Sequence, residues 1–201
     1  MIINIHPQNP QEKEIKRVVD ILENGGIIIY PTDTLYAFGC SIFDQKAVNK
    51  ICQLKQIDPK KVPLSFVCSN ISHISEYATL HNNTFSLLKK NLPGAFTFLL
   101  KGNHNLPRLF KEKKTVGVRI PDNKIVRSIV EILNHPIVST SLFIDDNEPE
   151  YATDPDLIHE KYGHIVDCVI DGGYGTLDVS TIVDCTEDSF EIIRQGKGIL
   201  K

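Results

Sequence analysis

Hydroxyl and carboxylate side chains crowd into one short segment that directly follows a run of isoleucines. Residues 27–29 are a β-branched run without polar alternation, which predicts a strand buried on both faces. Pro31 lacks a backbone N–H and ends that strand, and the sequence Thr-Asp-Thr-Leu-Tyr follows at 32–36. Because open α/β sheets bind ligands at the carboxyl ends of their strands, this segment is a candidate loop for binding a polar ligand. An ordinary strand-to-turn junction is the alternative.

The sequence contains no phosphate-binding loop of the Gly-x-x-x-x-Gly-Lys-(Ser/Thr) type, and the glycines at 172–175 lack Rossmann spacing. A phosphate ligand must then be held by separate cations and hydroxyls that the fold brings together. Suitable side chains occur at the ends of predicted elements: Lys55, Arg119, Arg194, Thr115, Ser139, Ser141, Ser180 and Thr181. Each also has an ordinary explanation, such as a surface ion pair for Arg119 or a helix C-terminus for Lys55.

Metal and nucleophile sites have weaker support. His159, His164 and Cys168 are close in sequence but lack the second ligand pair of a zinc site. The five cysteines form no Cys-x-x-Cys pair, and their odd number favours free thiols in a reducing compartment. Neither Cys40 nor Cys185 has a histidine nearby in sequence to activate it.

The elements that must position these groups alternate between helix and strand. Helical spacing predicts helices near 10–24, 44–55, 70–77, 82–91, 122–133 and 154–160. Strands are predicted near 27–30, 64–68, 95–101, 115–120, 136–140, 166–171, 179–184 and 190–194. We expect Asn9 to cap the first helix, Gly25 to end it and Asp44 to cap the second. This alternation predicts a single α/β domain over residues 1–201 with a mixed sheet.

The composition fits a single globular domain. A chain of 201 residues with 41% apolar content can bury one hydrophobic core and need not be split into two domains. The net charge of −3 shows no global bias toward nucleic acid, but the charges are uneven. Residues 101–127 carry eight Lys or Arg and two acids, whereas residues 145–156 carry six acids and no Lys or Arg. We therefore expect one cationic and one anionic region. No apolar stretch reaches the about 18 residues of a membrane span, and we expect a cytoplasmic location.

The segment Pro-Thr-Asp-Thr-Leu-Tyr-Ala-Phe-Gly at 31–39 resembles the signature of the YrdC-like family. Further matching segments are Lys55 after a helix, Pro93-Gly94 before Phe96-Thr97-Phe98, and residues 116–121, 139–141, 180–184 and 194–196. The match covers the chain from about residue 10 to residue 198, and residues 52–57 and 139–143 are most similar to the YciO branch. The resemblance implies a twisted mixed sheet with flanking helices and a concave cationic face.

Family members that are synthases make L-threonylcarbamoyl-AMP from threonine, bicarbonate and ATP, for the N6-threonylcarbamoyl modification of tRNA adenosine. The resemblance implies that Thr32, Arg119 and Ser180 bind threonine. It also implies a nucleotide site, with Mg²⁺ bridging the phosphates, made of Lys55, Thr115, Ser139, Ser141 and Arg194. Positioning and charge neutralisation suffice for such a transfer, so no catalytic side chain is expected.

Two positions depart from the synthase pattern. Synthases carry Lys-x-Arg and Ser-x-Asn, whereas this chain has Ile57 in place of the arginine and Phe143 in place of the asparagine. Each lost charge-assisted bond to a phosphate removes about 2–3 kcal/mol, unless Lys60 or Lys61 replaces the arginine. The second hypothesis is therefore a weakly catalytic or non-catalytic YciO-type protein that binds double-stranded RNA or tRNA through the basic residues 101–127. A sugar-phosphate lyase is a third possibility, but no acidic metal-binding cluster is evident.

Overall fold

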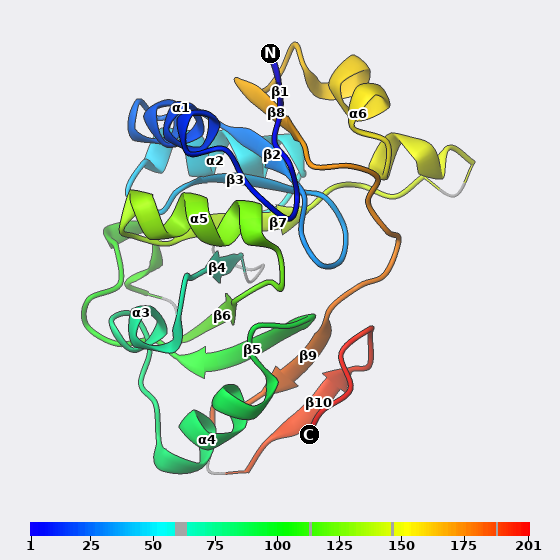
Figure 1. Ribbon diagram of the computed structural model, residues 1–201. Helices are drawn as coiled ribbons and strands as arrows, with labels where there is room; N and C mark the ends of the chain where they lie inside the picture. Colours follow the sequence, from blue (N-terminus) through cyan, green and yellow to red (C-terminus); the bar gives the residue numbers. More distant parts are fainter. Residues whose placement is uncertain (59–63, 113, 146, 188) are drawn as a thin grey trace.

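The computed structural model describes residues 1–58, 64–112, 114–145, 147–187 and 189–201. Through these residues runs one mixed sheet of ten strands, in the order β1-β8-β2-β3-β7-β4-β6-β5-β9-β10 (Figure 1). The strands are β1 (Ile2–Asn4), β2 (Ile28–Tyr30), β3 (Ala37–Ser41), β4 (Ser65–Val67), β5 (Phe96–Lys101), β6 (Thr115–Arg119), β7 (Ile137–Ser141), β8 (Cys168–Asp171), β9 (Thr181–Asp184) and β10 (Glu191–Arg194). The predicted α/β class with a mixed sheet is confirmed.

Helices flank this sheet on both faces. They are α1 (Glu12–Glu23), α2 (Gln45–Leu54), α3 (Ile71–Ser75), α4 (Asn82–Asn91), α5 (Lys124–Leu133) and α6 (Pro155–Tyr162), with two short 3-10 turns, η1 (Arg108–Phe110) and η2 (Pro149–Ala152). In the part of the chain that the structure describes, no helix combines the length and apolar character needed to cross a bilayer.

Helix ends follow the expected capping residues in two of three cases. The Asp44 carboxylate accepts a hydrogen bond from the backbone N–H of Ala47 at 2.8 Å. Gly25 follows the C-cap of α1 and has a φ of +78°, the left-handed conformation that ends a helix. The prediction that Asn9 caps α1 is wrong, because the helix begins at Glu12 and its N-cap is Gln11. The Gln11 side chain instead accepts from the N–H of His6, so it stabilises the incoming turn and not the helix end.

The sequence analysis did not predict two of the strands, β1 and β3. β3 lies directly after the hydroxyl segment and pairs antiparallel with both β2 and β7, with all five residues buried. Its sequence, Ala-Phe-Gly-Cys-Ser, contains a glycine and shows no alternation because both faces are covered. β1 is only three residues long and pairs parallel with β8. The hydroxyl segment is therefore the connection between two paired strands.

The two faces of the sheet are covered to different extents. One face carries the larger hydrophobic cluster, which extends from β8 to β9 and contains residues of α2, α3, α4 and α6. The opposite face carries a second cluster, in which α1 and α5 pack on β1, β8, β2, β3 and β7. In the described part of the chain this second cluster includes no residue of β5, β6, β9 or β10. Figure 1 shows α1 and α5 side by side in front of the upper strands, while β6 and β5 have no helix in front of them.

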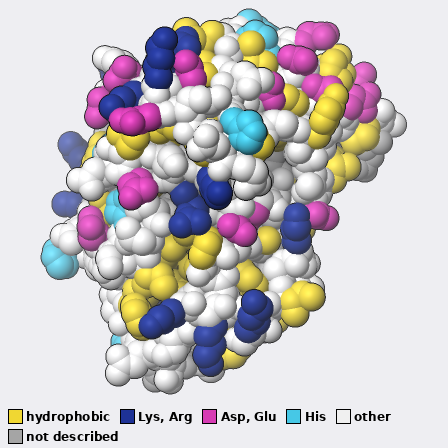
Figure 2. All heavy atoms as spheres, in the orientation of Figure 1, with side chains coloured by type: hydrophobic (Ala, Val, Ile, Leu, Met, Phe, Trp, Pro, Cys, Tyr) yellow, Lys and Arg dark blue, Asp and Glu magenta, His cyan; other side chains and the backbone are white. Residues whose placement is uncertain are grey.

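Charge follows the prediction only in part. Figure 2 shows acidic side chains gathered at the upper right, the place of η2 and α6 in Figure 1. Three basic residues of 101–127 have partners within the protein: Lys101 pairs with Glu187, Arg119 is buried beside Asp33, and the Lys124 amine donates to a backbone carbonyl. Lys113 lies outside the described residues. The concave cationic face that the resemblance implies stays a prediction.

Candidate functional site

A cavity of about 430 Å³ lies on the open half of the second sheet face. Its lining is rich in hydroxyls and includes two arginines: Thr34, Leu35, Ser65, Thr97, Leu99, Arg119, Ser139, Thr140, Ser141, Val179, Ser180, Ile182, Ile193 and Arg194. Five of the eight residues that the sequence nominated for ligand binding are among them, namely Arg119, Ser139, Ser141, Ser180 and Arg194. Residues far apart in sequence thus meet at one hollow.

Strand register explains why these side chains share a face. Ser65 on β4 stands opposite both Ser139 on β7 and Gly117 on β6, and Gly117 stands opposite Leu99 on β5. Paired residues point to the same side of a sheet, so this row faces the cavity. A Cβ at Gly117 would meet the Ser65 Oγ at 3.2 Å and the Thr97 Cγ2 at 3.3 Å. The missing side chain at Gly117 therefore deepens the cavity floor.

Arg119 is a buried cation that the hydroxyl segment holds in place. One guanidinium nitrogen donates to the Asp33 carboxylate and to the Thr34 hydroxyl, each at 3.0 Å. The other Asp33 oxygen accepts from the N–H of Asp122 at 2.9 Å, which ties the segment to the end of β6. The side chains of Arg119 and Asp33 are only 10% and 9% exposed, so the surface ion pair considered for Arg119 is a buried one. The Arg119 Nε is also buried and has no hydrogen-bond partner among the described residues.

Ser180 and Arg194 form the opposite wall, at the junction of β9 and β10. The hydroxyls of Ser180 and Thr97 are 2.9 Å apart and share one hydrogen bond, so the pair keeps one hydroxyl hydrogen for another acceptor. A guanidinium nitrogen of Arg194 donates to the Ser180 carbonyl at 2.7 Å. The Nε of Arg194 also donates to this carbonyl at 3.3 Å, and together the two bonds orient an exposed arginine along the cavity wall.

A tyrosine from the covered half supports Ser139. The Tyr30 hydroxyl donates to the Ser139 Oγ at 2.6 Å, and its ring passes over Gly39, where a Cβ would lie only 2.7 Å from the ring. Burial raises the pKa of Tyr30 to about 12, so the phenol stays protonated at neutral pH and remains a donor. Because Ser139 accepts this bond, its own hydroxyl hydrogen is available to a ligand in the cavity.

Lys55, the residue after α2, lies at the rim beside Ser141. Its amine donates to the Ser141 carbonyl at 2.8 Å and stands 3.7 Å from the centre of the Phe143 ring. Partial burial lowers the pKa of Lys55. Of the two departures from the synthase pattern, Phe143 thus contacts Lys55, whereas Ile57 packs against the larger core. Lys60 and Lys61, the candidate substitutes for the missing arginine, lie outside the described residues.

Thr32 and Thr115, like Lys55 at the rim, do not line the cavity. The Thr32 hydroxyl donates to the Leu35 carbonyl at 2.7 Å and accepts from the Thr34 N–H at 2.9 Å, so it shapes the loop that presents Thr34. Thr115 begins β6 opposite Lys101, on the same face as Gly117 but farther along the strand. Their assignment to threonine and nucleotide, respectively, stays a prediction.

Sequence reasoning did not nominate several cavity hydroxyls, among them Thr34, Ser65 and Thr97. Thr34 lies in the hydroxyl segment, but its neighbour Thr32 was chosen. For the other two a signal existed, because each is a lone hydroxyl in a strand whose neighbours are apolar. Such a residue marks a sheet face without a covering helix.

Nucleophile and metal chemistry find little support in the geometry. Burial raises the pKa values of Cys168 and Cys185 to about 11, so both are thiols at neutral pH. Burial raises the pKa of Cys40 as well. Among the described residues, no group of three or more His, Cys, Asp or Glu side chains is arranged to hold a metal ion.

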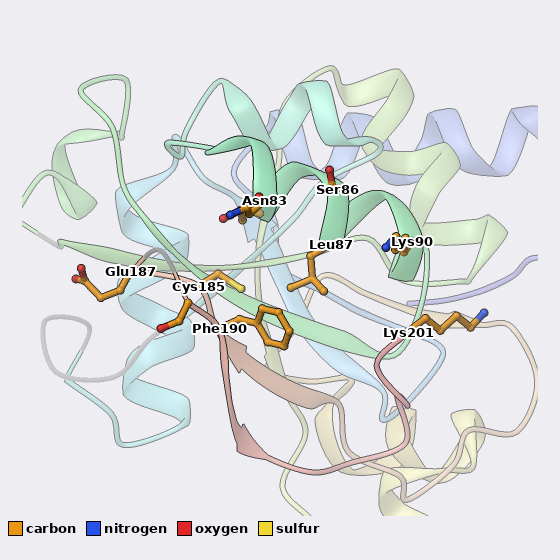
Figure 3. A pocket seen from close by; sticks show the side chains of 10 residues that line it. Asn83, Ser86, Leu87, Lys90, Cys185, Glu187, Phe190 and Lys201 are labelled. Carbon is orange, nitrogen blue, oxygen red and sulfur yellow. The ribbon is translucent and has the colours of Figure 1, made fainter.

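A second pocket, of about 480 Å³, lies between α4 and the connection from β9 to β10. Figure 3 shows Leu87 and Phe190 pointing into it, with Glu187 at one end and Lys201 at the other. Its described lining contains no arginine and none of the eight residues nominated from the sequence for ligand binding. The smaller, hydroxyl-rich cavity is therefore the candidate site.

Comparison with known proteins agrees with this fold. The family model of Sua5, YciO and YrdC proteins, which carries the description "Telomere recombination", matches residues 20–196. The uncharacterized protein YciO of Escherichia coli is 39% identical over 199 residues, covering 98% of this chain and 96% of the relative. Its crystal structure superposes with a TM-score of 0.90, covering 99% of this chain and 97% of that one.

More distant relatives have named activities or ligands. A putative threonylcarbamoyl-AMP synthase of Methanocaldococcus jannaschii is 33% identical over 200 residues, covering 97% of this chain and 92% of the relative. The crystal structure of Pyrococcus abyssi Sua5 complexed with L-threonine superposes with a TM-score of 0.84 at 25% identity, covering 98% of this chain and 57% of that one. The resemblance inferred from the sequence, including that to YciO proteins, is confirmed. The chain belongs to the Sua5/YciO/YrdC family.

Proposed function

We propose that this protein is an enzyme of the threonylcarbamoyl-AMP synthase type, which joins threonine, bicarbonate and MgATP for tRNA modification. The observation that carries this proposal is the convergence of Arg119, Ser139, Ser141, Ser180 and Arg194 on one cavity. A relative named as a putative synthase and a Sua5 structure with bound L-threonine support the choice of substrates.

Threonine fits the wall that contains Arg119. The buried guanidinium provides a cation for the amino-acid carboxylate, and Asp33 and Thr34 fix its orientation. The hydroxyl pair of Ser180 and Thr97 offers one free hydrogen for a second contact. The ligand side chain would then be recognised at the surrounding apolar residues, such as Leu35.

The nucleotide phosphates fit the wall formed by Ser139, Ser141 and Arg194. Ser139 presents its hydroxyl hydrogen because Tyr30 already donates to its oxygen, and Arg194 contributes an oriented guanidinium. The cavity lining contains no Asp or Glu among the described residues. Magnesium therefore enters as part of the MgATP substrate, with phosphate oxygens as its ligands, and not on a carboxylate site of the protein.

The reaction needs positioning more than covalent chemistry. Bicarbonate dissociates to carbon dioxide and hydroxide, and the threonine amine forms a C–N bond with the carbon dioxide. The proton that the amine releases combines with the hydroxide, so one water leaves and a carbamate remains. An oxygen of the resulting carbamate then attacks the α-phosphorus of ATP, the bond from that phosphorus to the bridging oxygen breaks, and pyrophosphate leaves. Arginines and hydroxyls held in fixed positions stabilise the charge in this transfer, so no nucleophilic side chain is required.

Pyrophosphate release that depends on threonine tests this proposal. Ser180→Ala and Arg194→Gln are each expected to lower the rate by about 10- to 100-fold, the cost of one or two hydrogen bonds to a charged group. Ser86→Ala on α4 and Arg17→Gln on α1 are matched controls away from the cavity and should keep the wild-type rate. A folded wild-type protein that binds ATP and threonine but releases no pyrophosphate would refute the synthase proposal.

Duplex RNA or tRNA binding without adenylation is the other hypothesis, and the structure favours it less. Two of the described basic residues of 101–127, Lys101 and Arg119, are already paired with acids. The binding protein would instead show a strongly salt-dependent affinity for duplex RNA and no pyrophosphate release.

A further inference from the structure

Phe143 is an exposed aromatic residue in a well-anchored position. It follows β7, and its ring is 46% exposed; the next residue, Ile144, is 40% exposed. The preceding residue, Leu142, is buried in the larger core, and its N–H donates to the Tyr36 carbonyl at 2.9 Å. The exposed ring therefore stands on a fixed backbone.

A cation backs this ring. The Lys55 amine lies 3.7 Å from the ring centre, within the range of a cation–π interaction, and the Ser141 carbonyl holds the same amine at 2.8 Å. Two contacts thus fix Lys55 against the ring, and the ring in turn loses freedom. Ordering an aromatic side chain beforehand lowers the entropy that a stacked ligand must overcome.

The ring also adjoins the hydroxyl-rich cavity. Ser141 lines that cavity, and Phe143 follows it by two residues. The Lys55 amine links the two, because it donates to the Ser141 carbonyl and lies over the Phe143 ring. A flat apolar surface therefore lies next to a hollow lined by arginines and hydroxyls. This pairing matches a ligand with a planar base at one end and phosphate at the other.

We propose that Phe143, backed by Lys55, is a stacking platform for an unpaired nucleobase whose attached phosphates enter the cavity. The base can come from a free nucleotide or from single-stranded RNA, since both offer the same face to an aromatic ring. The proposal rests on the proposed function only in using the cavity as the phosphate site. It also gives the Phe143 departure a role, because the side chain supplies a stacking contact where synthases have an amide.

A single-tryptophan variant tests the platform directly. The natural sequence has no tryptophan, so Phe143→Trp places the sole indole at this position. We expect ATP to quench its fluorescence in a saturable way, whereas tripolyphosphate, which lacks a base, should bind without quenching. Phe85→Trp is the matched control, because Phe85 on α4 is also 46% exposed and lies outside the cavity. That variant should show no quenching with either probe.

Affinity measurements complete the test. Phe143→Ala should weaken ATP binding about tenfold in calorimetry, equivalent to about 1.4 kcal/mol, while the affinity for tripolyphosphate stays within twofold. Phe143→Tyr should restore ATP binding. Equal losses for both probes would overturn the platform, because they would mean that Phe143 only shapes the phosphate site.

The outcomes separate the platform from the synthase proposal. Quenching by ATP identifies a free nucleotide as the source of the base. Quenching by a short single-stranded RNA but not by ATP supports the platform and argues against the synthase. If pyrophosphate release proceeds while neither ligand quenches the Phe143→Trp variant, the platform is wrong and the synthase proposal stands.

Discussion

The covered and open halves of one sheet face show how a single surface is divided between stability and binding. Over β1, β8, β2, β3 and β7, side chains such as Ile28 and Ile137 are buried beneath α1 and α5. Over β6, β5 and the Ser65 end of β4, the same face carries Ser65, Gly117 and Thr97. Among the described residues of these three strands, only Val67 of β4 belongs to the cluster that α1 and α5 cover. Coverage by a helix requires apolar side chains, whereas its absence allows hydroxyls to remain exposed to a ligand.

Substitution of Asp33 in the open half should have the largest effect on stability. Asp33→Ala leaves the buried Arg119 guanidinium without its counter-ion and removes the acceptor for the Asp122 N–H. We expect a loss of about 3–5 kcal/mol in the free energy of unfolding, measured by urea denaturation.

The exposed ion pair of Asp178 with Lys197 provides the control for Asp33. These two side chains are 53% and 42% exposed, so Asp178→Ala should cost less than about 1 kcal/mol. Equal losses for the two variants would show that burial does not distinguish these ion pairs.

Ile129 tests the covered half. Its side chain on α5 is fully buried in the second cluster, so Ile129→Ala should lower the free energy of unfolding by about 2–5 kcal/mol. The affinity of the folded fraction for ATP should not change, because this side chain does not line the cavity. Ile132→Ala on the same helix, where the side chain is 43% exposed, should cost under about 1 kcal/mol. An altered ATP affinity in Ile129→Ala would contradict the separation of the two halves.

The hydrogen bond from Tyr30 to Ser139 connects the covered half to the open half, and we expect its loss to have the smallest effect on stability. Tyr30→Phe keeps the ring in the covered half but removes the hydrogen bond to Ser139, which should cost about 1 kcal/mol at neutral pH. Burial raises the pKa of Tyr30 from 10.0 to about 12, so wild-type stability from this group persists below pH 10 and is lost as the pH rises toward 12. In chemical denaturation, the free energy of unfolding of Tyr30→Phe should fall less than that of the wild type between pH 10 and pH 12. An identical fall would mean that Tyr30 does not cause this pH dependence.

The order of helices and strands could largely be read from the sequence, because apolar periodicity is a local property. The strand at 27–29 and the cap at Asp44 followed from residue types alone. β3 could not be recognised, because its pairing with β2 and β7 is set by partners that lie elsewhere in the chain. The basic run at 101–127 did not reveal that Arg119 is buried, because its partner Asp33 lies far away in the chain.

The sequence by itself determined the family, the α/β class and the residue types that a polar anionic ligand requires. Tertiary structure decided which of them meet: strand register aligned Ser65, Ser139 and Gly117, while local hydrogen bonds kept Thr32 out of the cavity lining. It also decided that Lys55 rests on Phe143. Residue chemistry is encoded position by position, but a binding site depends on distances between strands that only the closed sheet defines.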